Sequence, residues 1–192
     1  MKLHRSIPGA ALAAVLLAGC GSSPPLRYYA LDVVAPAGTP VRAPSATPIR
    51  IRHISVPPEM DHRGLTHHQG ASQITISETD QWSAPLAELI QGALTRDLGE
   101  RLGYEQVVAP AAQPLSSGQA SLDLDFVSLA ADDGCAISAQ VNWVLTVPNG
   151  TLQHGTAHLM APATGCPAGL PAALSAALGD LADQLARQFS SP

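Results

Sequence analysis

Positively charged residues are scarce in this chain, and their scarcity excludes several classes of protein. The 192 residues include 10 lysines and arginines against 15 aspartates and glutamates, and Lys2 is the only lysine. A nucleic-acid-binding protein needs a basic face, and adhesion to anionic lipid needs clustered basic side chains. The composition argues against both functions, so any attachment to a membrane has to rest on another chemistry.

Hydrophobic runs long enough to span a bilayer are also missing. The apolar stretch at residues 7–18 is shorter than the roughly 20 apolar residues that a spanning helix needs. Lys2 and Arg5 precede this stretch, and the small residues Ala18 and Gly19 end it. A positive start, a short apolar stretch and small residues before a cleavage point are typical of a secretory signal. We predict that residues 1–19 are a signal peptide.

The end of this signal carries a further pattern. Residues 17–20, Leu-Ala-Gly-Cys, resemble the lipobox of bacterial lipoproteins, in which the cysteine receives a diacylglycerol and becomes the new N-terminus. The resemblance implies that Cys20 is lipidated and that residues 20–27 form a polar tether; two or more acyl chains anchor a protein stably. No aspartate follows Cys20. This resembles the Gram-negative lipoproteins that go by default to the outer membrane and are not retained in the inner membrane. We expect a lipid-anchored protein on the periplasmic face of that membrane; an ordinary signal peptide with a chance cysteine is the alternative.

The remaining chain has the size of one domain, which we place at residues 28–192. If Cys20 carries lipid, Cys135 and Cys166 remain as a pair in an oxidising compartment. We predict a disulfide between them, which would stabilise the fold by about 3–4 kcal/mol on the chain-entropy model. Two free buried thiols are the alternative.

Alternation of apolar and polar residues predicts the strands, and proline-rich stretches predict loops at residues 35–48 and 110–118. In the second strand, a bulge near His53 would bring Ile49, Ile51, Ile54 and Val56 to one side. The predicted strands are 28–34, 49–56, 64–68, 73–77, 105–109, 121–129, 136–147 and 151–160, with a hairpin across 69–72.

Leucines at helical spacing predict two amphipathic helices. The first follows Ser83, a candidate cap, has Pro85 in its first turn and ends at Gly103. The second covers residues 171–189. We therefore predict an α/β (α+β) sandwich, in which the two helices pack on one face of a mainly antiparallel mixed sheet.

Several segments resemble the PqiC (YmbA-like) family of transport-auxiliary lipoproteins. Besides the lipobox, they are the tyrosine-rich first strand, the isoleucine pattern that ends at Pro57 and the final amphipathic helix. Residues 60–63, Met-Asp-His-Arg, are similar to the family's Leu-Asp-Arg segment, although His62 interrupts it. The resemblance is strongest at residues 82–86, Trp-Ser-Ala-Pro-Leu, which are similar to the family's tryptophan before a helix.

This resemblance implies a function as well as a fold. Such proteins accompany MCE-type lipid transport systems, in which an inner-membrane permease and a periplasmic MCE-domain tube (PqiB-like) carry lipid across the envelope. The lipoprotein is an accessory subunit that docks the tube at the outer membrane, and a homo-oligomeric ring is a further implied arrangement. We take Met60, Asp61 and Arg63, in a segment expected to be exposed, and the polar face of the sheet as candidate partner contacts.

Patterns that would indicate catalysis are missing or weak. The sequence has no Gly-x-Ser-x-Gly elbow and no glycine-rich phosphate loop. Asp123 and Asp125 share a strand face and could act as a pair of catalytic carboxylates. We favour the alternative that they form the solvent-exposed side of an amphipathic strand. Trp82 and Trp143 are expected in the core, with the lining of a groove as the alternative. We predict a non-enzymatic protein without a cofactor.

Seven histidines raise the question of a metal site. His67 and His68 are adjacent and point to opposite faces of an extended chain, so they do not readily share one ion with His62. His154 and His158 share a strand face, which we expect to be partly exposed. We therefore predict no metal site. The alternatives to docking are a periplasmic lipid-binding protein or chaperone with an apolar cavity and a small metal-dependent hydrolase.

Overall fold

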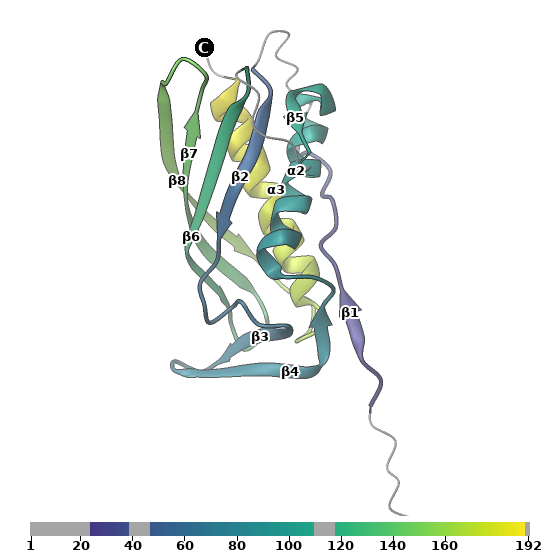
Figure 1. Ribbon diagram of the computed structural model, residues 1–192. Coiled ribbons are helices and arrows are strands. Elements are labelled where there is room, and N and C mark those ends of the chain that lie inside the picture. The colour runs from purple at the N-terminus through teal and green to yellow at the C-terminus, as the bar shows by residue number, and fades with distance from the viewer. Residues whose placement is uncertain (1–23, 39–46, 110–117, 191–192) are drawn as a thin grey trace, which may run out of the picture.

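The computed structural model describes residues 24–38, 47–109 and 118–190 (Figure 1). The predicted signal peptide, Cys20 and most of the two predicted loops lie outside these residues.

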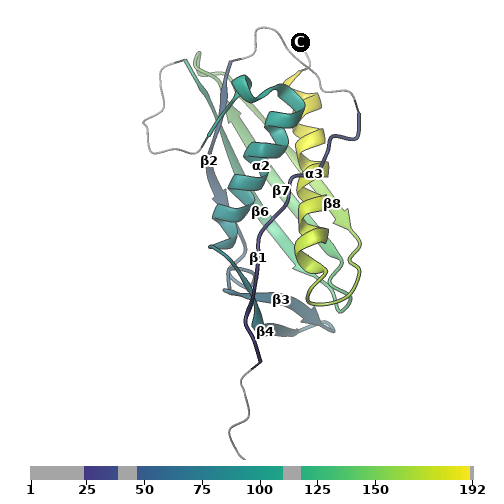
Figure 2. The ribbon, with the colours of Figure 1, turned by 90° about the vertical axis from the view of Figure 1, so that its right-hand side faces the viewer.

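A five-stranded sheet carries the larger part of the domain (Figures 1 and 2). Its order is β5-β2-β6-β7-β8. Strand β2 is parallel to both β5 and β6, whereas β7 is antiparallel to β6 and β8. The strands are β2 (Ile49–Ser55), β5 (Val107–Val108), β6 (Ala120–Ala131), β7 (Ile137–Thr146) and β8 (Leu152–Ala161).

Helices α2 (Leu86–Leu102) and α3 (Leu170–Phe189) cover one face of this sheet side by side, as Figure 2 shows. The leucines of both helices are buried, as the spacing predicted, except Leu89, which is partly buried. They meet the inward residues of the strands, such as Leu122, Leu124 and Val141. The predicted α/β sandwich is confirmed.

A second sheet closes one end of the molecule. It has the order β1-β4-β3 and consists of β1 (Arg27–Tyr29), β3 (Gly64–Gln69) and β4 (Gln73–Trp82). Strand β1 is parallel to β4, and β3 and β4 form the predicted antiparallel hairpin. Figure 1 shows the β3-β4 hairpin lying across the end of the domain, below the helices, with β1 running upright at its right-hand side. The strands are thus divided between two mixed sheets.

The predicted bulge in β2 is present. The register with β6 shifts between Ile51 and His53, so that Ile49, Ile51 and Ile54 all reach the core. Val56 follows the strand and packs partly against the same core.

The predicted first strand is wrong over most of its length, because β1 ends at Tyr29 and the chain then crosses the two helices. We call residues 31–37 the strap; Figure 2 shows it between α2 and α3. Its backbone bonds to helix side chains instead of a neighbouring strand. The N–H of Asp32 donates to Ser175 Oγ at 3.0 Å, and that of Val34 donates to Asp97 Oδ1 at 2.8 Å.

A buried ion cluster holds the strap and the helices together. Arg101, 2% exposed, donates from Nε to Asp183 Oδ1 at 2.6 Å. It also donates to the carbonyl oxygens of Val34 and Gly179, each at 3.0 Å. Asp97 is fully buried in the same cluster, and burial raises the pKa of its carboxyl group despite the nearby arginine. The cluster joins three segments that are far apart in the sequence.

Only the N-terminal end of α2 differs from the prediction. Ser83 makes no capping hydrogen bond, because the helix begins after Pro85, two residues further on. Gly103 ends the helix as predicted, with a φ of 101° that favours glycine. The predicted strand 105–109 is reduced to the two residues of β5, because the chain first forms the short 3-10 helix η1 (Tyr104–Gln106).

Candidate docking groove and apolar cavity

An open groove of about 460 Å³ lies where β4 turns into α2. It is lined by Asp61, His62 and Arg63 on one side and by residues 82–85 on the other. These are two of the segments that resemble the family, and they are about twenty residues apart in the sequence. The structure therefore brings both motifs to one surface.

Two backbone hydrogen bonds position the walls of the groove. The N–H of Trp82 donates to the Arg63 carbonyl at 2.8 Å, and the N–H of Ser83 donates to the Tyr29 carbonyl at 2.8 Å. The Trp82 side chain is only 2% exposed and anchors this wall in the core, as expected. The end of β1, also a family-like segment, is thus fixed to the same place.

The expectation that Met60 is exposed, on which its choice as a candidate partner contact rested, is wrong. Met60 is 2% exposed, because the N–H groups of Met60 and Asp61 bond back to the carbonyls of Pro57 and Pro58 in a turn. This turn directs the methionine side chain into the core. Asp61 and Arg63, in contrast, are exposed and line the groove.

A second cluster of polar side chains fastens β1 beside the groove. The Asp80 side chain, 3% exposed, bonds to the Arg27 guanidinium at 2.8 Å and accepts from the Tyr29 hydroxyl at 2.8 Å. It also accepts from the hydroxyls of Ser77 and Thr79. The bond from Arg27, helped by these hydroxyls and opposed by burial, lowers the pKa of Asp80 to about 2. Asp80 is therefore a carboxylate at any ordinary pH.

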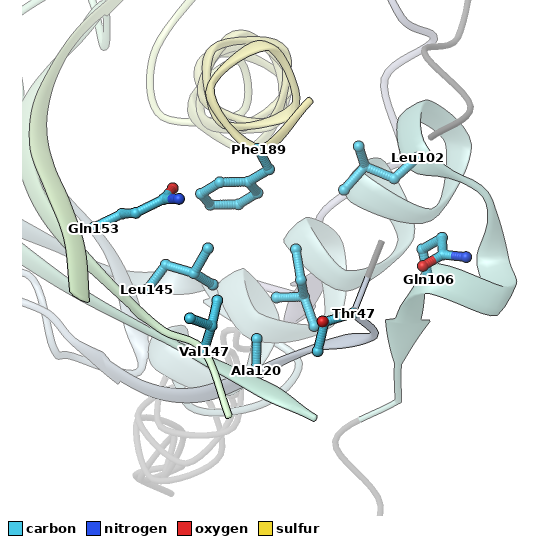
Figure 3. A pocket seen from close by; sticks show the side chains of 9 residues that line it. Thr47, Leu102, Gln106, Ala120, Leu145, Val147, Gln153 and Phe189 are labelled. Atoms are coloured by element: carbon cyan, nitrogen blue, oxygen red, sulfur yellow. The ribbon is translucent and has the colours of Figure 1, made fainter. Parts of the chain in front are cut away.

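An apolar cavity of about 130 Å³ lies between the helices and the sheet (Figure 3). Leu102 ends α2 and Phe189 ends α3, and both point into this space together with Leu145 of β7. The rings of Phe189 and Trp143 also pack edge to face, with centroids 5.7 Å apart. Trp143 is 8% exposed and belongs to the core, as expected. The cavity is lined by Thr47, Ile49, Leu102, Gln106, Ala120, Leu145, Val147, Gln153 and Phe189.

The structure joins Cys135 and Cys166 in a disulfide, with Cα atoms 5.2 Å apart. Among the described residues, one ring nitrogen of His67 lies within 4.8 Å of both sulfur atoms. This is the candidate metal cluster in that part of the chain, and its two cysteines are bonded to each other. His62 and His68 do not belong to it.

The other face of the five-stranded sheet carries the polar residues of the alternating strands. Asp123 of β6 forms an ion pair with Arg52, and Asp125 accepts from the Ser55 hydroxyl. The two aspartates therefore bond to separate partners on β2, as polar residues on a solvent-exposed strand face commonly do. His154 and His158 lie on the exposed side of β8.

Sequence reasoning proposed Asp61 and Arg63 as contacts. For the opposite wall it offered the lining of a groove only as the alternative for Trp82, and it gave residues 83–85 no part in binding. The motif at residues 82–86 was the signal available for it. The cavity at Phe189 was not predicted, because its lining comes from several separate parts of the chain.

The chain was compared with known proteins. None of the curated proteins matches it. A crystal structure of an uncharacterized protein has a TM-score of 0.69 and 19% identity, covering 86% of this chain and 99% of the other. The crystal structure of protein XCC0632 from Xanthomonas campestris has a TM-score of 0.65 and 17% identity, covering 83% and 92%. At these identities the likeness shows the fold alone.

The family comparison extends further than the fold. The family described as "ABC-type transport auxiliary lipoprotein component" matches residues 29–186, which include both walls of the groove, the strap and nearly all of both helices. In the part of the chain that the structure describes, no helix combines the length and the apolar character that crossing a membrane requires. The chain belongs to the family of ABC-type transport auxiliary lipoprotein components.

Proposed function

We propose that this protein is a non-enzymatic docking subunit of an MCE-type (PqiABC-like) lipid transport system. In this proposal Cys20 carries the lipid anchor in the outer membrane, and the domain binds the PqiB-like MCE protein in the periplasm. The observation that carries the proposal is the groove, where the family-like segments at residues 60–63 and 82–86 meet. Asp61 and Arg63 present charged groups of both signs at its rim.

Site-specific photocrosslinking in intact membranes tests this proposal. A photoreactive residue at position 61 or 63 is expected to capture an MCE-domain protein. The matched control is position 180, because Asp180 is exposed on α3, away from the groove lining. Capture from position 180 alone would contradict the assignment of the groove, and capture from none of the three positions would contradict docking by these surfaces.

The cavity supports a second candidate function, a periplasmic lipid-binding protein or chaperone. Its lining is largely apolar, yet its volume of about 130 Å³ is small. A cavity of about 150 Å³ binds benzene, and ligand pockets usually span about 300–1,000 Å³. The space therefore fits a short segment of an alkyl chain, not a whole lipid. Mass spectrometry of an organic extract from the purified protein checks this candidate, since a stoichiometric lipid would favour it over docking.

A further inference from the structure

The sheet β1-β4-β3 has two faces with different surroundings. On β3, Leu65 is fully buried, and a ring nitrogen of His67 lies within 4.8 Å of the sulfurs of Cys135 and Cys166. This face therefore points to the body of the domain. Because side chains alternate along a strand, Gly64, Thr66 and His68 lie on the opposite side, which we call the outer face. Gly64 and Thr66 are buried there, Thr66 being 1% exposed, so the exposed part of this face lies mainly on β4 and β1.

The strand pairing shows which residues of β4 and β1 share the outer face. Directly paired residues lie on the same side of a sheet. His68 pairs with Ile74, and Thr66 pairs with Ile76. A Cβ atom at Gly64 would lie 2.7 Å from Ile76 Cγ2, so the isoleucine packs across that glycine.

A bulge in β4 continues the outer face to β1. Gly64 pairs with Gln81 although Thr66 pairs with Ile76, so the parity of β4 changes between these positions. Gln81 in turn pairs with Tyr28. The outer face therefore runs from Tyr28 through Gln81 to Ile76 and Ile74. Trp82 points inward, so the groove that it lines is a different surface.

The exposed part of this face carries apolar side chains beside the partly exposed polar residues His68 and Gln81. Tyr28, Ile74 and Ile76 are 55%, 38% and 44% exposed, and Leu26 just before β1 is 52% exposed. Glu78, two residues after Ile76 on β4, is an exposed carboxylate on the same strand. Because the chain has few basic residues, any attraction of this surface to lipid has to come from its apolar side chains and not from positive charge.

The position of the N-terminal segment indicates what covers the outer face. Only three residues separate Cys20 from Pro24, and an extended chain spans at most about 3.6 Å per residue, so these two Cα atoms lie within about 14 Å of each other. Figure 1 shows residues 24–26, just before β1, at the end of the domain that β3 and β4 close. A bilayer that holds acyl chains on Cys20 therefore lies at this end.

We propose that the outer face of the β1-β4-β3 sheet rests on the phospholipid surface that holds the anchor. Tyr28, Ile74 and Ile76 then lie at the headgroup level, where aromatic and aliphatic side chains of peripheral proteins are commonly buried. The long axis of the domain points away from the membrane, with the Phe189 cavity at the far end. This inference rests on the proposed lipidation of Cys20.

Two tyrosines provide an internal comparison for the test. Tyr28 on the outer face and Tyr104 in η1 are similarly exposed, at 55% and 60%. The lipidated protein is reconstituted in phosphatidylcholine–phosphatidylethanolamine vesicles without any other protein and oxidised by hydroxyl radicals. We expect Tyr28 to react several-fold more slowly than Tyr104. Equal rates in vesicle-bound protein would overturn the proposal.

An unlipidated form separates this outcome from a failure of the proposed function. It carries a cleavable non-lipoprotein signal in place of residues 1–19 together with Cys20→Ala, and its two tyrosines should react at similar rates. If the wild-type protein neither floats with vesicles nor carries acyl mass on its N-terminal peptide, the lipidation is wrong. If it floats and Tyr28 stays reactive, only the resting face is wrong.

Charge substitutions test the isoleucines directly. The double substitution Ile74→Asp and Ile76→Asp should restore the oxidation of Tyr28 in vesicles to the rate of Tyr104. The matched control is Val127→Asp with Val144→Asp, at residues 51% and 37% exposed on the five-stranded sheet; it should leave Tyr28 protected. Melting of the unlipidated forms checks that both variants fold. Continued protection of Tyr28 in the isoleucine variant would overturn the proposal.

Discussion

Arg101 bonds to both helices and the strap, and its replacement should be far more costly than that of a surface arginine. The change Arg101→Met leaves Asp97 and Asp183 without their cation and the carbonyls of Val34 and Gly179 without a donor. Breaking a buried pair in this way costs about 3–5 kcal/mol. Urea unfolding, monitored by circular dichroism, measures the loss.

The matched control for Arg101 is Arg52→Met. Arg52 is 57% exposed in its side chain and pairs with Asp123 at the surface. Exposed pairs are worth about 0–1 kcal/mol, so the loss should be small. Equal losses in the two variants would contradict the assignment of Arg101 as a buried cross-link.

Asp80 makes the stability of the domain depend on pH in the acidic range. Its folded pKa of about 2 lies below the value of about 3.9 for an unfolded chain. The stabilisation is therefore complete above about pH 5 and is lost as the pH falls through about 4 towards 2. Salt weakens part of it, because Arg27 is 59% exposed in its side chain.

The comparison with Asp80→Asn measures this contribution. At neutral pH the variant should lose about 1–3 kcal/mol of unfolding free energy, because the Arg27 and hydroxyl donors lose a charged acceptor. The difference from the wild type should shrink as the pH is lowered from about 5 to about 2. A difference that stays constant over this range would show that Asp80 is not ionised in the way described.

At the scale of elements, the disulfide fixes the turn between β6 and β7 to the chain just before α3. Asp132 Oδ1 accepts from the N–H groups of Gly134 and Ala136 and orders this turn, in which Cys135 has a φ of 64°. The loop that the bond closes spans 31 positions. The turn is thus held both by local hydrogen bonds and by a distant covalent link.

Removal of the disulfide by Cys135→Ser with Cys166→Ser should lower the free energy of unfolding by about 3–4 kcal/mol. The loss arises because the unfolded chain regains the freedom that the closed loop denies it. Urea unfolding of the double variant measures it, and alkylation of the native, unreduced wild-type protein should find neither thiol. Two reactive thiols in that protein would refute the bridge.

At the scale of the whole molecule, the two ends of the domain have different surroundings. The β1-β4-β3 end adjoins the proposed anchor, whereas the far end carries the C-terminus of α3 and the Phe189 cavity. The groove lies beside α2 near the end that adjoins the proposed anchor, on a surface different from the outer face. A domain fixed in this orientation can present its groove at a set height above the membrane.

The anchor predicts a simple labelling result. The wild-type protein should incorporate radiolabelled palmitate and fractionate with outer membranes, whereas Cys20→Ala should incorporate none, because the thiol that receives the lipid is gone. The double variant lacking Cys135 and Cys166 is the control and should still be labelled. Label in the Cys20→Ala protein would show that lipid is attached elsewhere.

The sequence by itself determined the positions of most elements and the family. Local periodicity located both helices, the hairpin and the bulge at His53, because the spacing of apolar residues reports the local backbone geometry directly. It overextended the first strand, since residues 30–34 alternate as a strand does but bond to side chains of α2 and α3. No local pattern distinguishes these two sets of partners.

The tertiary structure alone decided which segments meet. The division into two sheets, the burial of Met60, the meeting of residues 61–63 with residues 82–85 and the cavity at Phe189 all depend on contacts between segments far apart in the sequence. A side chain's period along the chain states which face it occupies but not what lies opposite that face. Strand pairing and the path of the strap over the helices determine what lies opposite each face. They therefore also determine which residues form the surfaces proposed for a partner and for a membrane.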